Sequence, residues 1–238
     1  MNNNLILISG KTATGKSLSL RNIPNPDGVF YLNCENNKGL PFKSGFQEFT
    51  VTDPKQVYEA FVEAENRPNV HTLVIDTATF MMDMYETMYV NNSPNTMKAW
   101  GEYAQFFKTL MSQYVANSTK NIIFLAHTMD VMNEAEMVNE TLVKVKGSLM
   151  NQGIESFFST VISTKKVPLK VLKDMKSDML NITEEEEMLG FKYVFQTRLT
   201  KETVNERIRS SMGMWKPTET FIDNDVSIVL AHIHKYYN

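Results

Sequence analysis

The 238-residue sequence contains one cysteine, Cys34, so it cannot form an internal disulfide and suits a reducing compartment. It lacks an apolar run long enough to span a bilayer, and its first residues do not form a secretory signal. Its net charge of −3 excludes a uniformly basic surface, so contact with nucleic acid would need a local patch. We therefore expect a cytoplasmic protein with no membrane partner.

Apolar sequence is sufficient for a core, since 42% of the residues are hydrophobic and 21% are charged. The length suits one α/β domain with insertions. Internal repeats, low-complexity segments and convincing linkers are absent from the sequence. We predict that residues 1–238 form a single domain.

The most specific pattern is G-x-x-x-x-G-K-[ST] at Gly10–Ser17, between an apolar run and a predicted helix start. Gly10 and Gly15 allow a tight turn and close approach to a polyphosphate. The backbone amides from Thr12 to Ser17 would form an anion-binding nest, Lys16 would reach the β and γ phosphates, and the Ser17 hydroxyl would ligate Mg²⁺. The predicted nucleotide-binding residues are Gly10, Lys11, Thr12, Ala13, Thr14, Gly15, Lys16, Ser17 and Leu18.

Apolar runs alternate with helical patterns through the first half of the chain, which predicts an α/β fold. We expect a P-loop NTPase with a central, mostly parallel sheet, helices on both faces and β-hairpin additions in the C-terminal half. Residues 130–140 are acidic and are expected to be irregular. The predicted strands are residues 5–9, 28–33, 71–76, 120–127, 141–146, 157–167 and 191–199. The predicted helices begin near residues 15, 54, 77, 94, 148, 184 and 225.

Two carboxylates follow predicted strands. Asp76 ends an aliphatic run, where it would lie beside Ser17 and hold Mg²⁺, or alternatively cap the next helix. Glu35 follows the second strand, where it could polarise a water for in-line attack on the γ-phosphate, or alternatively be a solvated loop residue. Lys16 and Glu35 are thus the predicted catalytic residues, and ATP and Mg²⁺ the expected ligands.

Further residues have both a functional and a simple structural interpretation. His127, at the tip of the fourth strand, could sense the γ-phosphate, or could be an ordinary structural histidine. A positive group could complete the site from a neighbouring subunit, although lysines on edge strands are usually solvated. The candidates for this role are Lys144, Lys146, Arg198 and Lys201.

The second half of the chain is locally basic, with Lys165 and Lys166 at its centre and aromatic residues nearby. Such a patch could bind a nucleic-acid backbone, or could be a lysine-rich solvated surface.

The order of Gly10–Ser17, Glu35, Leu73–Asp76 and His127 is similar to that of the RecA/Rad51 core. The chain most closely resembles the short RecA-like ATPases of bacteriophages that are linked to single-strand-annealing recombination, and residues 146–158 and 222–226 also fit. The resemblance implies an ASCE-type fold, Mg-ATP hydrolysis stimulated by single-stranded DNA, and a ring or filament of identical subunits. It also implies a single-strand-binding protein as a further partner, and the host-cell cytoplasm as the location.

By position, the resemblance makes Glu35 the activating glutamate and His127 the sensor, where recombinases usually carry glutamine. It makes the segment after His127 the DNA-contacting loops. Two other classes remain open: a nucleotide-gated loader or scaffold for a protein partner, and a small-molecule kinase. The residues after Asp76, Thr77–Phe80, contain no arginine of the kind that a nucleoside kinase would need. A DNA-dependent ATPase is therefore the leading interpretation.

Overall fold

The computed structural model describes residues 3–175 and 177–238. Its strands are β1 (Leu5–Gly10), β2 (Val29–Asn33), β3 (Gln47–Thr50), β4 (Thr72–Asp76), β5 (Asn121–Asn133), β6 (Val138–Val143), β7 (Thr160–Pro168), β8 (Phe191–Gln196) and β9 (Phe221–Asp223). Its α-helices are α1 (Gln56–Asn66), α2 (Ala78–Tyr85), α3 (Thr96–Thr109), α4 (Gly147–Gln152), α5 (Leu169–Leu172), α6 (Glu184–Leu189) and α7 (Val226–Tyr237). Two π-helical turns, Glu86–Val90 and Leu110–Val115, extend α2 and α3.

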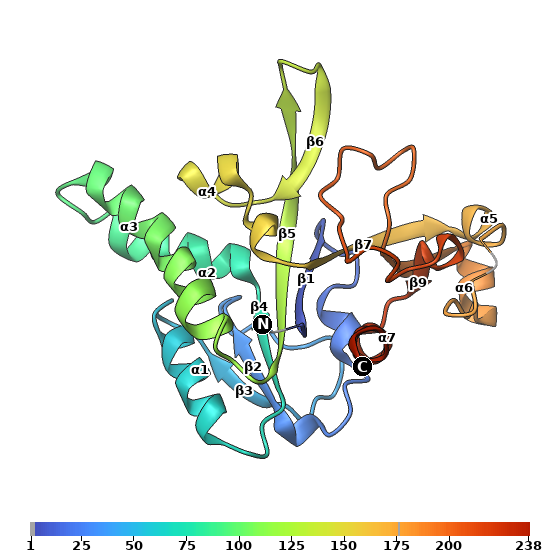
Figure 1. Cartoon of the computed structure of the whole chain (residues 1–238), viewed down its shortest axis with the longest axis horizontal. Coiled ribbons are helices and arrows are strands. Elements are labelled where there is room, and N and C mark those ends of the chain that lie inside the picture. The colour runs from blue at the N-terminus through green and yellow to red at the C-terminus, as the bar shows by residue number, and fades with distance from the viewer. Residues whose placement is uncertain (1–2, 176) are drawn as a thin grey trace.

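Among the described residues, nine strands form one mixed sheet, in the order β3-β2-β4-β5-β1-β7-β8-β9, with β6 paired to β5 (Figure 1). The pairings from β3 to β7 are parallel, and β8 and β9 are added in antiparallel pairings. The predicted mostly parallel sheet is therefore confirmed. The strands predicted over residues 157–167 and 191–199 are found as β7 and β8, and they pair with each other.

Successive side chains of a strand point to opposite sides of the sheet. In the central strands β1 and β4 every residue is buried, so both faces of the sheet are covered there. On β1, Leu5 and Leu7 join one core cluster, and Ile6 and Ile8 join another. Each fully buried side chain of this size contributes about 1.5–3 kcal/mol to stability. The two faces therefore need separate covering layers.

Helices supply both layers (Figure 1). Phe61 of α1, Met81 of α2 and Phe107 of α3 pack into the first cluster. Val229 and Ile233 of α7 pack into the second, together with the short 3₁₀ helix Ser17–Leu20. The expectation of helices on both faces is thus confirmed.

Strand β5 is the longest strand described and has two different halves. Its first half, up to His127, lies in the sheet between β4 and β1. Its second half leaves the body and pairs with β6 as a hairpin that projects from the molecule (Figure 1). The expectation that residues 130–140 are irregular is wrong. Both faces of this hairpin are partly solvated, so the sequence lacks the apolar alternation that predicts a strand.

Several other predicted boundaries differ from the structure. The helix expected after Gly15 is only the 3₁₀ helix Ser17–Leu20, and Pro24 and Pro26 follow it closely. The strand predicted over residues 141–146 ends at Val143. Sequence analysis also missed β3, a short edge strand with exposed side chains. In the described part of the chain, no helix is long and apolar enough to cross a membrane.

Candidate nucleotide site

The glycine-rich loop joins β1 to the 3₁₀ helix and curls around the side chain of its own lysine. Lys16 Nζ donates hydrogen bonds to the carbonyl oxygens of Gly10, at 3.0 Å, and Lys11, at 2.9 Å. Lys16 is only 6% exposed, and burial lowers its pKa from 10.5 to about 8. A cation held in this way fits the predicted role of Lys16 as a phosphate ligand.

The two glycines of the loop are required by space and by backbone conformation. A Cβ atom on Gly10 would lie 2.1 Å from Thr164 Oγ1 of β7. Gly15 has a φ of +93°, which side chains disfavour. The loop also contacts β7 directly, because the hydroxyls of Thr14 and Thr164 are 2.6 Å apart. The cradle therefore depends on the adjacent strand for its position.

Asp76 and Ser17 meet at the carboxyl edge of the sheet, as their positions in the sequence predicted. Asp76 Oδ2 accepts hydrogen bonds from Ser17 Oγ and from the Tyr31 hydroxyl, each at 2.7 Å. Burial raises the pKa of the Asp76 carboxyl. The alternative role for Asp76, capping the next helix, belongs to Thr77, whose side chain accepts a bond from the Phe80 amide.

The second oxygen of this carboxylate, Asp76 Oδ1, is buried and has no hydrogen-bond partner among the described residues. Such orphaned acceptors are rare in folded proteins and indicate a missing donor, water or ion. Across the same described residues, no cluster of three or more His, Cys, Asp or Glu could hold a metal. A hydroxyl and one carboxylate suit an ion that takes its remaining ligands from phosphates and water, as Mg²⁺ does.

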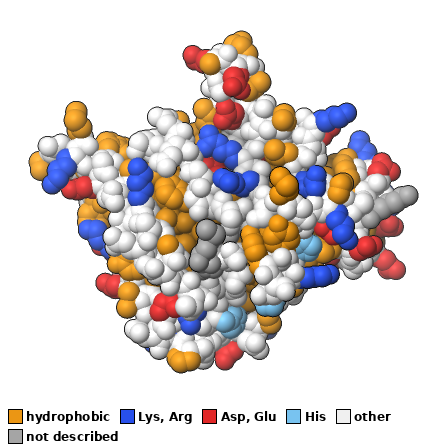
Figure 2. Space-filling model, in the orientation of Figure 1, with side chains coloured by type: hydrophobic (Ala, Val, Ile, Leu, Met, Phe, Trp, Pro, Cys, Tyr) orange, Lys and Arg blue, Asp and Glu red, His pale blue; other side chains and the backbone are white. Residues whose placement is uncertain are grey.

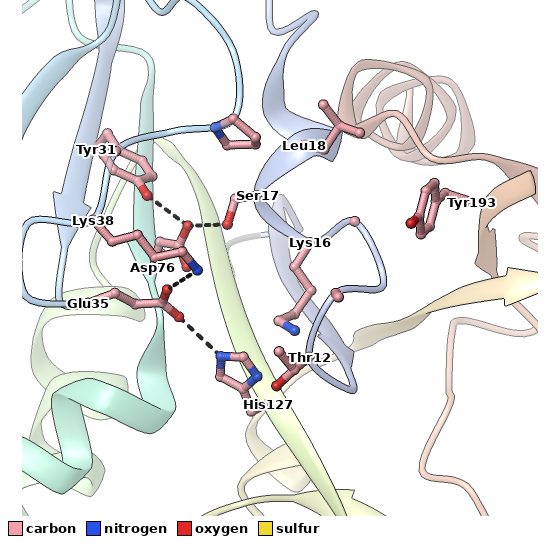
Figure 3. A pocket seen from close by; sticks show the side chains of 14 residues that line it. Thr12, Lys16, Ser17, Leu18, Tyr31, Glu35, Lys38, Asp76, His127 and Tyr193 are labelled. Carbon is pink, nitrogen blue, oxygen red and sulfur yellow. Dashed lines mark hydrogen bonds and ion pairs between the residues drawn. The ribbon is translucent and has the colours of Figure 1, made fainter.

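Glu35 and His127 also come together, from the ends of β2 and of the sheet half of β5 (Figure 3). His127 Nε2 donates to Glu35 Oε1 at 3.1 Å, and Lys38 Nζ donates to Glu35 Oε2 at 3.0 Å. The hydrogen bond from His127, with that from Lys38, lowers the pKa of Glu35 to about 2. Glu35 is therefore a fixed, ionised carboxylate rather than the freely solvated loop residue of the alternative interpretation.

These groups line one cavity of about 300 Å³. Lys16, Ser17, Asp76, Glu35 and His127 all face it (Figure 3). Sequence analysis missed Lys38, Tyr31 and Tyr193, which also line the cavity. No motif identifies them, because Tyr31 lies inside an apolar strand and Tyr193 lies far along the chain on β8.

The residues proposed to act on a neighbouring subunit lie elsewhere. Lys144 and Lys146 do not share a strand as expected, because β6 ends one residue earlier. Lys146 pairs with Glu86 at 2.7 Å, and Arg198 donates to the Trp215 carbonyl oxygen at 2.6 Å. Neither these three residues nor Lys201 is among those that line the described cavity.

The two lysines proposed to bind DNA have different surroundings on β7. Lys165 is half-buried in an ion pair with Glu206. Lys166 is exposed, and its Nζ lies 3.7 Å from the centre of the Phe191 ring. Of these two lysines, Lys166 is the one that presents an exposed charge beside an aromatic ring.

The sheet and the cavity together define a class. Strand β5 lies between β1, which leads into the P-loop, and β4, which ends at Asp76. The P-loop, Asp76, Glu35 and His127 lie together at the carboxyl ends of the parallel strands. This arrangement is that of the RecA-like P-loop nucleoside triphosphatase fold.

Comparison with known proteins identifies a family for the chain. The sequence profile of the AAA domain family matches residues 2–190, so the chain belongs to that family. Among solved structures, a KaiC-like protein from the hyperthermophilic archaeon Pyrococcus horikoshii OT3 is similar, with a TM-score of 0.43 and 12% identity. The match covers 85% of this chain and 82% of that one. No curated protein matches the sequence.

Proposed function

We propose that this chain hydrolyses Mg-ATP, with water as the acceptor of the γ-phosphoryl group. The observation that carries the proposal is the ionised Glu35 carboxylate in the same cavity as Lys16 and Ser17. A carboxylate beside the phosphate end of a P-loop can accept a proton from an attacking water.

Each residue has a defined part in this reaction. The loop amides and Lys16 bind the phosphates and offset their charge. Glu35 orients a water and accepts its proton as the water oxygen attacks the γ-phosphorus, and the bond to the β–γ bridging oxygen breaks. His127 and Lys38 hold Glu35 in place and keep it ionised.

The Ser17 hydroxyl and the Asp76 carboxylate would hold Mg²⁺ with the nucleotide. When bound, the ion would neutralise charge on the phosphate oxygens. Ser17 can keep its hydrogen bond to Asp76 while it offers a lone pair to the ion.

The test is phosphate release from Mg-ATP by the purified chain and by Lys16→Ala. We expect turnover by the wild type and none by the variant. No release by the wild type, or transfer of the phosphoryl group to an added nucleoside instead of water, would contradict the proposal.

We propose further that single-stranded DNA stimulates this turnover, in phage recombination or replication. Support comes from the sequence resemblance and from the exposed Lys166 beside Phe191, since a cation next to an aromatic face suits single strands. The β5–β6 hairpin is a poor candidate for the DNA contact. Residues 128–143 carry four carboxylates and no lysine or arginine, which would repel phosphates.

DNA stimulation is measured as phosphate release with and without an unstructured oligonucleotide, at several salt concentrations. We expect a salt-sensitive increase that Lys166→Ala reduces and that Lys98→Ala, an exposed lysine on α3, does not change. An ATPase rate that is independent of DNA would reject this second step and leave hydrolysis intact.

The hairpin favours a second candidate, a nucleotide-gated loader that acts on a protein partner. It projects from the body, its tip is acidic, and Met132 and Met137 are exposed on it (Figure 2). Slow hydrolysis that a protein partner accelerates and DNA does not would favour this candidate. Light scattering with and without Mg-ATP tests the proposed ring or filament, in which Lys144, Lys146, Arg198 or Lys201 would reach a neighbouring site.

A further inference from the structure

The buried tyrosine Tyr31 makes a contact that sequence motifs do not predict. It lies in the middle of β2, and its side chain is on the sheet face covered by α7. The residue is only 3% exposed, yet its hydroxyl has a specific partner, since it donates to Asp76 Oδ2 at 2.7 Å. This contact crosses from β2 to the neighbouring strand β4.

The contact leaves the two oxygens of Asp76 in different states. Oδ2 accepts bonds from both Tyr31 and Ser17, whereas Oδ1 is buried without a partner among the described residues (Figure 3). Two donors on one oxygen fix the rotation of a carboxylate. The unpaired oxygen then has a defined position.

We propose that Tyr31 is a positioning residue for the magnesium site, which orients Asp76 so that Oδ1 is held for the ion or for one of its waters. This inference rests on the proposed function, because it requires Mg²⁺ to bind with the nucleotide. Partners that orient a metal ligand commonly change metal affinity by about 10–100-fold when they are removed.

A tyrosine suits this position better than a shorter donor. Its ring packs in the apolar layer, 6.3 Å from the ring of Phe46, and its length brings a hydroxyl to the carboxyl edge of the next strand. Phenylalanine would keep this packing and remove only the donor. Tyr31→Phe is therefore a selective test.

The experiment measures binding of a fluorescent ATP analogue to wild type and Tyr31→Phe, with saturating Mg²⁺ and with EDTA. We expect the variant to bind the Mg²⁺ complex about tenfold more weakly. Binding in EDTA should be unchanged, because the phosphate cradle does not include Tyr31. The control is Tyr58→Phe, which removes a partly buried hydroxyl that donates to the Phe106 carbonyl oxygen at 2.7 Å, outside the site.

A double-mutant cycle with Asp76→Asn tests whether Tyr31 acts through this carboxylate, because the asparagine removes the charged group that the hydroxyl orients. Non-additive effects of the two substitutions on Mg²⁺-dependent binding support the inference. Equal losses with Mg²⁺ and with EDTA, or additive effects, would overturn it. Failure of the wild type to bind the analogue at all would instead reject the proposed function.

Discussion

At the scale of single residues, the shifted pKa values of Glu35 and Lys16 in the nucleotide cavity each lead to a prediction. The pKa of Glu35 falls to about 2 because His127 and Lys38 donate hydrogen bonds to it. A base of this kind remains ionised throughout the neutral range. Its contribution to folding stability is present above pH 4.5 and is lost as the pH falls towards 2.

Glu35→Gln should slow phosphate release by at least about 100-fold, since the amide cannot accept the proton from water. Nucleotide binding should persist, because the phosphate cradle is untouched. Release and binding are measured on the same preparation, with Glu63→Gln of α1, whose partner is the exposed Arg67, as the matched control. Turnover within a few-fold of wild type would remove Glu35 from the mechanism.

The lowered pKa of Lys16 leads us to expect that ATP binding depends on pH. Burial lowers its pKa to about 8 in the free protein, whereas bound phosphates favour the charged form. Binding above pH 8 must therefore take up a proton, and affinity should fall by up to about tenfold per pH unit as the pH rises. Dissociation constants at pH 7, 8 and 9 check this, and a flat profile would contradict it.

The same lysine affects folding stability with the opposite dependence on pH. The unfolded chain, in which Lys16 titrates near 10.5, holds more protons than the folded chain between pH 8 and 10.5. The contribution of Lys16 to stability therefore rises with pH across that window, while ATP affinity falls. Denaturant titrations of the free protein measure this contribution separately from binding.

At the scale of elements, the P-loop packs closely against β7 at Gly10 and Thr164. Gly10→Ala would place a methyl group against the side chain and backbone of Thr164 and should destabilise the protein by about 2 kcal/mol. It should also weaken ATP binding, because the loop must shift. Adding Thr164→Ala should recover part of both losses, since the nearest atom is the Thr164 hydroxyl. Urea denaturation and ATP titration measure the two effects, and a Gly10→Ala variant with wild-type values would contradict them.

The elements also show what the sequence could reveal. The inner strands were predictable, because parallel strands buried on both faces are continuous apolar runs. Ser17 and Asp76 were predictable as neighbours, because parallel strands end at one edge. The contact of Tyr31 with Asp76 was not predictable. It depends on β2 lying next to β4, and local sequence patterns do not determine the order of strands in a sheet. Edge strand β3 and the hairpin were not predicted, because strands with mostly exposed side chains lack the apolar alternation that marks a buried face.

At the scale of the whole molecule, nucleotide binding should stabilise the folded chain. Mg-ATP at about 100 times its dissociation constant adds about 2.7 kcal/mol of stability. For a chain of this size that corresponds to a rise in Tm of roughly 5–10 °C. Thermal unfolding measures the shift, and Lys16→Ala should abolish it. An equal shift in that variant would show that ATP binds elsewhere.

Strand β5 continues without a break from the sheet into the hairpin, so one strand carries both a residue that lines the cavity and an arm that projects from the body. Asp130, three residues beyond His127, pairs with Lys11 of the P-loop at 2.7 Å, so the base of the hairpin lies beside the nucleotide site. The described residues of the hairpin, 128–143, do not line the cavity. Adding two residues to each strand would lengthen it by about 6.8 Å and keep every side chain on its original face. Related chains could therefore carry hairpins of different length beside the same nucleotide site, and the tip could be exchanged by design without changing the residues that line the cavity.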